Sequence, residues 1–123
     1  MPRPIGPDFI GLQAEDLDAA KAFYGDRLGL PVARRTPEAV IFGTEPAAFA
    51  VRKPLGPVAE PKGSGVGLWF ACDDPWGLHD RLASEGIAIL APPGLAPFGL
   101  AFTFRDPFGY AVVAHGPSRD DAR

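Results

Sequence analysis

The sequence contains a single cysteine, Cys72, and only two histidines in 123 residues. One cysteine excludes an intrachain disulfide, and neither a CxxC pair nor the Cys/His spacing of a structural zinc site is present. Cys72 lies beside apolar residues in "WFACDD". We interpret it as a packed small hydrophobe rather than as a nucleophile, because free cysteines are usually buried.

The sequence also lacks an excess of basic charge and a long apolar run. Twelve Lys and Arg stand against 15 Asp and Glu, for a net charge of −3. This balance gives no basic surface for nucleic acid and no polybasic patch for a membrane. Pro2, Arg3, Pro4 and Gly6 interrupt the N-terminus, so we predict no signal peptide and no membrane span, and a cytoplasmic location.

Signatures of nucleophilic catalysis and of nucleotide binding are missing as well. The few Ser and Thr residues have no His–Asp arrangement beside them in a strand–turn–helix context. No glycine-rich phosphate loop follows a strand.

Two similar stretches organise the chain. In residues 8–30, "DFIGLQAEDLDAAKAFYGDRLGL", a strand over 8–14 precedes an N-cap at Asp16 and an amphipathic helix that ends at Gly29. In residues 67–86, "GLWFACDDPWGLHDRLASEG", a strand precedes a cap at Asp73 or Asp74 and a helix with proline at its first position.

Further short strands complete each half, and the order β-α-β-β-β occurs twice. Asp16 and Asp74 are 58 residues apart, each with a strand before it and a helix after it. We predict an α+β fold in which two βαβββ modules form curled mixed sheets around a concave cleft, with the helices outside. The expected segments are a single domain over 1–123 with modules at 5–56 and 64–117, a Pro/Gly linker at 54–64, a loop at 91–99 and a flexible tail at 118–123.

These residues resemble the vicinal oxygen chelate superfamily of glyoxalases, bleomycin-resistance proteins and extradiol dioxygenases. The resemblance rests on "DLDAAKAFYGDRLGL" in the first half, and on "DDPWGLHDRLASEGI" and "FTFRDPFGYAVV" in the second. It implies the fold predicted above. In the family's enzymes it also implies a divalent metal, held by His or Gln on the first strand and Glu on the last strand of each half.

The family's four ligand positions can be located by counting. Seven residues before Asp16 and Asp74 stand Phe9 and Gly67, and seven after Asp106 stands Val113. The fourth position falls at Val51 or Arg52, depending on how the Glu45-Pro46 turn is aligned. None of these is a usual ligand of a hard divalent cation. We therefore predict no metal and no other cofactor, as in the bleomycin-resistance-like branch, whose members are usually homodimers with clefts shared between subunits.

Two alternatives for the histidines remain open. A displaced metal cluster of Gln13, Glu45 and His115 would move the site by two residues. His115 shares the face of Val113 at period two, where it contacts a ligand, acts as a weak base, or simply ends the strand in solvent. We expect His79 to be a partly exposed helix residue.

Strand alternation and the nine phenylalanines predict the lining of the cleft. Trp69 is expected on the cleft face, with Leu68 and Phe70 beneath the helix. Phe98 is a candidate lid, and Arg52 either meets a polar ligand edge or is a solvated strand end. The candidate ligand-binding residues are Phe9, Gln13, Phe42, Phe49, Arg52, Trp69, Phe98, Phe102, Val113 and His115.

The function predicted from these observations is the metal-free sequestration of a small aromatic or antibiotic-like molecule in an apolar cleft of a homodimer. The alternative is a glyoxalase- or dioxygenase-like enzyme with a relocated metal site. A third hypothesis is an accessory domain without a small ligand. The sequence leaves open whether the modules pair within one chain or swap across the dimer.

Overall fold

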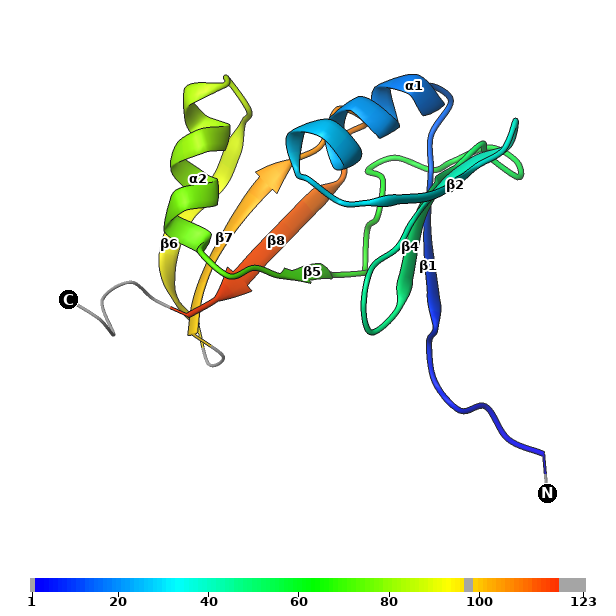
Figure 1. Ribbon diagram of the computed structural model, residues 1–123, viewed down its shortest axis with the longest axis horizontal. Coiled ribbons are helices and arrows are strands. Elements are labelled where there is room, and N and C mark those ends of the chain that lie inside the picture. Colours follow the sequence, from blue (N-terminus) through cyan, green and yellow to red (C-terminus); the bar gives the residue numbers. More distant parts are fainter. Residues whose placement is uncertain (1, 97–98, 118–123) are drawn as a thin grey trace. The chain divides into compact units, whose positions relative to one another are not determined.

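The computed structural model describes residues 2–96 and 99–117. The chain forms two compact units that divide between Val58 and Ala59, inside the predicted linker. Each unit holds one helical segment and one four-stranded sheet (Figure 1).

The first unit has the order β-α-β-β-β. Its strands are joined as β1-β4-β3-β2, with β1 parallel to β4 and the other pairs antiparallel. The elements are β1 (Phe9–Gln13), α1 (Leu17–Ala20), η1 (Lys21–Arg27), β2 (Val32–Arg35), β3 (Ala39–Phe42) and β4 (Ala48–Arg52). The helix widens in η1 to π-type hydrogen bonding, where the Leu28 N–H donates to the Phe23 carbonyl at 2.8 Å.

The second unit repeats this topology. Its sheet has the order β5-β8-β7-β6, again with only the first pair parallel. The elements are β5 (Leu68–Ala71), α2 (Pro75–Ser84), β6 (Ile89–Ala96), β7 (Gly99–Arg105) and β8 (Ala111–Gly116). The predicted α+β fold with two βαβββ modules is confirmed.

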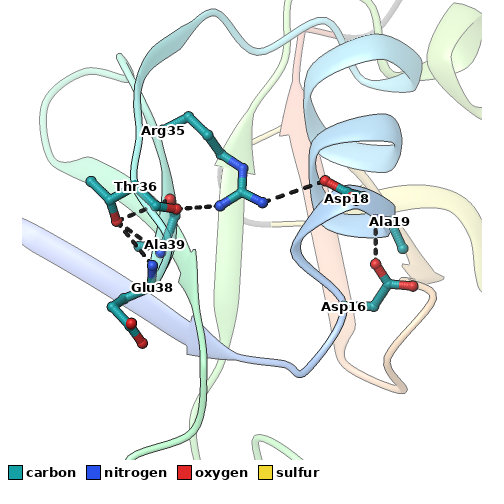
Figure 2. A network of polar contacts seen from close by, with 7 residues as sticks. All are labelled: Asp16, Asp18, Ala19, Arg35, Thr36, Glu38 and Ala39. Atoms are coloured by element: carbon teal, nitrogen blue, oxygen red, sulfur yellow. Dashed lines mark hydrogen bonds and ion pairs between the residues drawn. The ribbon is translucent and has the colours of Figure 1, made fainter.

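Equivalent aspartates begin the two helical segments. The Asp16 carboxylate accepts a hydrogen bond from the Ala19 N–H at 2.9 Å (Figure 2), and Asp74 accepts from the Gly77 N–H at 3.0 Å. Asp74 is therefore the cap, with Pro75 at the first helical position, where a missing N–H costs nothing. Gly29 (φ 85°) follows the first helix in a left-handed conformation that favours glycine.

The core of the first unit lies between its helix and one face of its sheet. Tyr24 is fully buried, and its ring centroid lies 6.1 Å from Phe42 and 5.0 Å from Phe49. Val40 and Val51, which pair across β3 and β4, share this face and are also fully buried. Figure 2 shows how Arg35 of β2 reaches from this side of the sheet to the Asp18 carboxylate of α1, 3.4 Å away.

The core of the second unit is built in the same way. Helix α2 packs on β6, β7 and β8, and Leu82, Phe102 and Val112 are buried between them. Burial alternates along β7 and β8, with every second residue facing the helix. This alternation is typical of a sheet that is covered on one face.

The predicted loop over 91–99 is wrong for most of its length. β6 continues to Ala96 and pairs with β7, which begins at Gly99. Pro92 and Pro93 fall where the register shifts between Ala91 and Gly94. β6 is the edge strand and has a neighbouring strand on one side only. A proline, which has no N–H, can therefore be accommodated there without the loss of a hydrogen bond between strands. Phe98 and the predicted tail over 118–123 lie outside the described residues.

No helix in the described part of the chain combines the length and the apolar character needed to span a bilayer.

Candidate functional site

Each sheet has one face covered by its helix, and we call the opposite face the open face of that sheet. On the second sheet, strand pairing assigns alternate residues to this open face, whereas Leu100, Phe102 and Phe104 face the helix and are buried. The residues of the second open face are Trp69, Ala71, Ala101, Thr103, Arg105, Ala111, Val113 and His115. Most of these side chains are small, and one of them is a large aromatic ring.

Trp69 is that ring. Its partner in the register is Val113, and 47% of its surface is exposed. The ring centroid of Trp69 lies 5.6 Å from that of His115, with 65° between the two planes. Strand alternation predicted that Val113 and His115 share a face, and the pairing of β5 with β8 adds Trp69 to that face.

The indole of Trp69 lies over Gly67. A Cβ atom added at Gly67 would stand 3.1 Å from Trp69 Nε1 and 3.4 Å from Trp69 Cδ1. The missing side chain at Gly67 thus provides the space that the indole occupies. A larger residue at this position requires the ring of Trp69 to move.

The first open face also carries an aromatic ring and a glycine two residues apart on its edge strand, but in the opposite order along the chain. Phe9 and Gly11 are equivalent to Gly67 and Trp69 by the 58-residue spacing. Phe9 is 52% exposed, and its Cε1 atom lies 3.7 Å from a Cβ placed at Gly11. Each open face therefore carries one aromatic ring leaning over a glycine on its parallel edge strand.

Two further candidates lie at the end of the first open face. Gln13 and Arg52 are partners in the register of β1 and β4. The Oε1 atom of Gln13 accepts a hydrogen bond from the Leu55 N–H at 2.8 Å, which holds the segment after β4. The Nε of Arg52 donates to the Lys53 carbonyl at 3.1 Å.

Three predicted ligand-binding residues do not lie on an open face. Phe42 and Phe49 stack on each other beneath the first helix, with ring centroids 5.8 Å apart. Phe102 lies beneath α2, where its ring meets His79 at 5.5 Å. All three are buried and belong to the helix–sheet cores. Alternation within a strand shows which residues share a face, but not which face the helix covers.

The comparison with protein families agrees with the topology and its duplication. Residues 6–114 match the Glyoxalase/Bleomycin resistance protein/Dioxygenase superfamily. The chain belongs to this superfamily.

Relatives within the superfamily are distant. Protein YetH of Bacillus subtilis (strain 168), described as uncharacterized, is 26% identical over 106 residues, which cover 81% of this chain and 88% of YetH. A lactoylglutathione lyase from Agrobacterium tumefaciens is 25% identical, with a TM-score of 0.72 and coverage of 92% of this chain and 94% of that one. TnmS3, an antibiotic binding protein from Streptomyces sp. CB03234, is 23% identical, with a TM-score of 0.75 and coverage of 96% and 100%.

The strand register corrects one of the four superfamily ligand positions. Gly11 pairs with Ala50, whereas the equivalent Trp69 pairs with Val113. The residue equivalent to Val113 is therefore Ala50, and not Val51 or Arg52. Val51 is fully buried on the helix-covered face.

The residues present do not fit the superfamily's divalent metal. The four positions hold Phe9, Ala50, Gly67 and Val113, whose side chains offer no oxygen or imidazole ligand. Within residues 2–96 and 99–117, no three His, Cys, Asp or Glu side chains gather in a way that could hold a metal ion.

The surroundings of His79 and Cys72 indicate structural roles for both residues. His79 packs between Trp76 and Phe102, and its Nδ1 lies 3.0 Å from an Asp80 carboxylate oxygen. Burial raises the pKa of the half-buried Cys72 thiol, and the nearby carboxylates of Asp73 and Asp74 raise it further.

Three polar residues on the open faces were not singled out by the sequence analysis. Arg34 pairs with Ile41 on the first sheet, while Thr103 and Arg105 lie on β7 of the second. The signal that could have found them is their place in the alternation of their strands, once the helix-covered face is known.

Proposed function

We propose that this protein sequesters a small aromatic molecule without a metal, by stacking it on the second open face. The exposed indole of Trp69 carries the proposal, since it is 47% exposed on the edge strand of a face whose side chains are mostly small. An indole supplies a large, flat contact area at low conformational cost, and it pairs well with another aromatic ring.

The surroundings of Trp69 favour a planar ligand. Ala71, Ala101 and Val113 leave the space above the sheet unfilled by long side chains. The edge contact with His115 supports the indole from one side. A ligand that covers the other side of the ring removes apolar surface from water, at about 25 cal/mol per Å².

The superfamily and its relatives are consistent with a binding role. TnmS3 is described as an antibiotic binding protein, and its likeness to this chain concerns the fold. The absence of ligand side chains at Phe9, Ala50, Gly67 and Val113 favours binding over the superfamily's metal chemistry. The homodimer expected for this branch belongs to the proposal, and light scattering at known protein concentration tests it.

Tryptophan fluorescence tests the proposed site, because the chain has two tryptophans on different sides of the second sheet. Trp69 lies on the open face, and Trp76 lies on α2 beside His79. In the variant Trp76→Phe, aromatic antibiotics from a screening panel should quench the remaining emission. In Trp69→Phe, the same compounds should leave the emission nearly unchanged. Quenching of equal size in both variants would argue against the open face as the site.

Elemental analysis of tag-free protein, followed by titration with a divalent metal, separates this proposal from a relocated metal enzyme. We expect neither stoichiometric metal nor tight binding, because the described residues offer no cluster of ligands. One tightly bound metal ion per chain would overturn the proposal and favour an enzyme of the same fold.

A further inference from the structure

The charged side chains on the strands of the two open faces are all arginines. On the second open face this is Arg105, and on the first open face they are Arg34 and Arg52. Acidic residues outnumber basic ones in the whole chain, 15 to 12. The open faces are therefore basic in a protein that is acidic overall.

The acidic residues near the sheets lie elsewhere. Asp18 and Asp80 are on the helices, and Asp106 is buried in the turn before β8. Asp8 and Glu38 stand one residue before β1 and β3, and Glu15 and Asp73 stand two residues beyond the ends of β1 and β5.

Basic side chains on the helix sides and on the open faces also differ in whether a carboxylate neutralises their charge. On the helix sides, Arg35 pairs with Asp18 at 3.4 Å and Arg81 with Glu85 at 3.9 Å. In the described part of the chain, the three open-face arginines form no ion pair with a carboxylate. The Nη1 of Arg105, for example, donates only to a neutral carbonyl, that of Gly109, at 3.1 Å.

Arg105 lies within the same stretch of sheet as the indole. It pairs with Ala111 on β8, at the end of the sheet toward which Trp69 leans as it covers Gly67. β8 separates the strands of the two residues, so a substituent on a ring stacked on Trp69 would reach the guanidinium across β8. Guanidinium groups bind carboxylates and similar oxyanions through paired, charge-assisted hydrogen bonds.

We propose that the ligand of the second open face is an aromatic anion, with its ring on Trp69 and its oxyanion directed to Arg105. This inference rests on the proposed function and narrows its ligand class. The unbalanced positive charge of both faces raises the local concentration of anions and disfavours cations.

Three naphthalene probes of equal ring size test the charge requirement. We would measure the dissociation constants of 2-naphthoate, 2-naphthamide and 2-naphthylmethylammonium through quenching of Trp69 in the Trp76→Phe background. Naphthoate should bind about tenfold more tightly than the neutral amide, as expected for one charged hydrogen-bonded pair, and the cation should bind most weakly.

Arg105 variants locate the charge that matters. Arg105→Gln should weaken naphthoate binding about five- to tenfold and leave naphthamide unchanged, while Arg105→Lys should retain most of the preference. The matched control is Arg81→Gln, which removes an exposed charge from α2 and should change neither probe. A preference for naphthoate that survives Arg105→Gln unchanged would overturn the assignment of Arg105.

The other outcomes of the probe experiment distinguish the charge inference from the proposed aromatic site on which it rests. If the amide or the cation quenches Trp69 at concentrations as low as naphthoate does, the charge inference is wrong and the aromatic site stands. If none of the three probes quenches Trp69, both the aromatic site and the inference that rests on it fail.

Discussion

The imidazole of His115 meets the indole of Trp69 edge-on across the parallel strands β8 and β5, with 5.6 Å between the ring centroids. The contact orients the only tryptophan on an open face among the described residues. Both residues lie on the open face, on the side of the sheet opposite to α2.

We predict a measurable coupling between these two residues. In a double-mutant cycle of Trp69→Ala and His115→Ala, the coupling in the free energy of unfolding should be about 0.5–1 kcal/mol, the value of a partly exposed aromatic pair. Urea unfolding measures it. As a control, Trp69→Ala and His79→Ala should be additive, because His79 lies on the helix side. Coupling of equal size in the control would contradict the assignment.

Gly67 should matter for binding more than for folding. Gly67→Ala places a methyl group 3.1 Å from Trp69 Nε1, so the indole must move. We expect naphthoate affinity to fall about threefold to tenfold, while the free energy of unfolding changes by less than about 0.5 kcal/mol.

The control for this prediction is Gly56→Ala, in the segment after β4 of the other unit. An added Cβ there meets no atom within 4 Å. The affinity should therefore stay at the original value, as measured by the same Trp69 quenching. Unchanged affinity and an unchanged emission maximum in Gly67→Ala would show that the indole does not depend on the space above this glycine.

Asp106 should be important for stability and irrelevant to ligand preference. The residue is 4% exposed, and its Oδ1 atom accepts hydrogen bonds from the N–H groups of Phe108, at 2.9 Å, and Tyr110, at 2.8 Å. Asp106→Ala leaves both donors without this acceptor and should lower the free energy of unfolding by about 2–3 kcal/mol. Asp106→Asn keeps one acceptor oxygen and should cost about half as much.

Urea unfolding of the Asp106 variants is best compared with Asp26→Ala. The side chain of Asp26 is 72% exposed, and its ion pair with Lys21 spans 3.9 Å. Its removal should change stability by less than about 0.5 kcal/mol. Equal effects at the two positions would show that the turn before β8 does not depend on the buried carboxylate.

Cys72 should react slowly and only at alkaline pH. Burial disfavours the thiolate and raises the pKa of the thiol, and the charge of Asp73 acts in the same direction, whereas a backbone hydrogen bond from Asp74 offsets part of the effect. The rate of alkylation by iodoacetamide should therefore rise at a pH above the value of about 8.5 that is typical of a free cysteine.

The same pKa shift has a consequence for stability. Because the unfolded chain loses the thiol proton first, stability is fully present below the unfolded pKa and falls as pH rises toward the folded one. Cys72→Ala should flatten this part of the stability–pH curve. Rapid alkylation at neutral pH would contradict the interpretation of Cys72 as a packed, unreactive thiol.

Local features were predictable because their signals are local. Asp16 begins the first helix through a hydrogen bond that spans three residues, and Gly29 ends it with a positive φ. The alternation that places Val113 and His115 on one face follows from the geometry of a strand. These features needed no knowledge of the rest of the chain.

The predicted boundary of one strand was wrong, because the effect of a proline depends on where its strand lies in the sheet. Pro92 and Pro93 indicate a loop when taken alone, yet they lie within β6. An edge strand leaves one row of backbone groups unpaired, so the missing N–H groups are tolerated there. Sequence position does not reveal which strand becomes an edge.

The sequence by itself determined the duplication, the helix caps and the lack of ligand side chains at three of the superfamily's metal positions, because each depends on residue type and spacing. Only the tertiary structure decided that Ala50 is the fourth position, since the register across the Glu45-Pro46 turn is set by strand pairing. It also decided that Phe42, Phe49 and Phe102 fill the cores while Arg34 and Arg105 lie on open faces. The physical reason is that a strand has two equivalent sides until a helix packs on one of them.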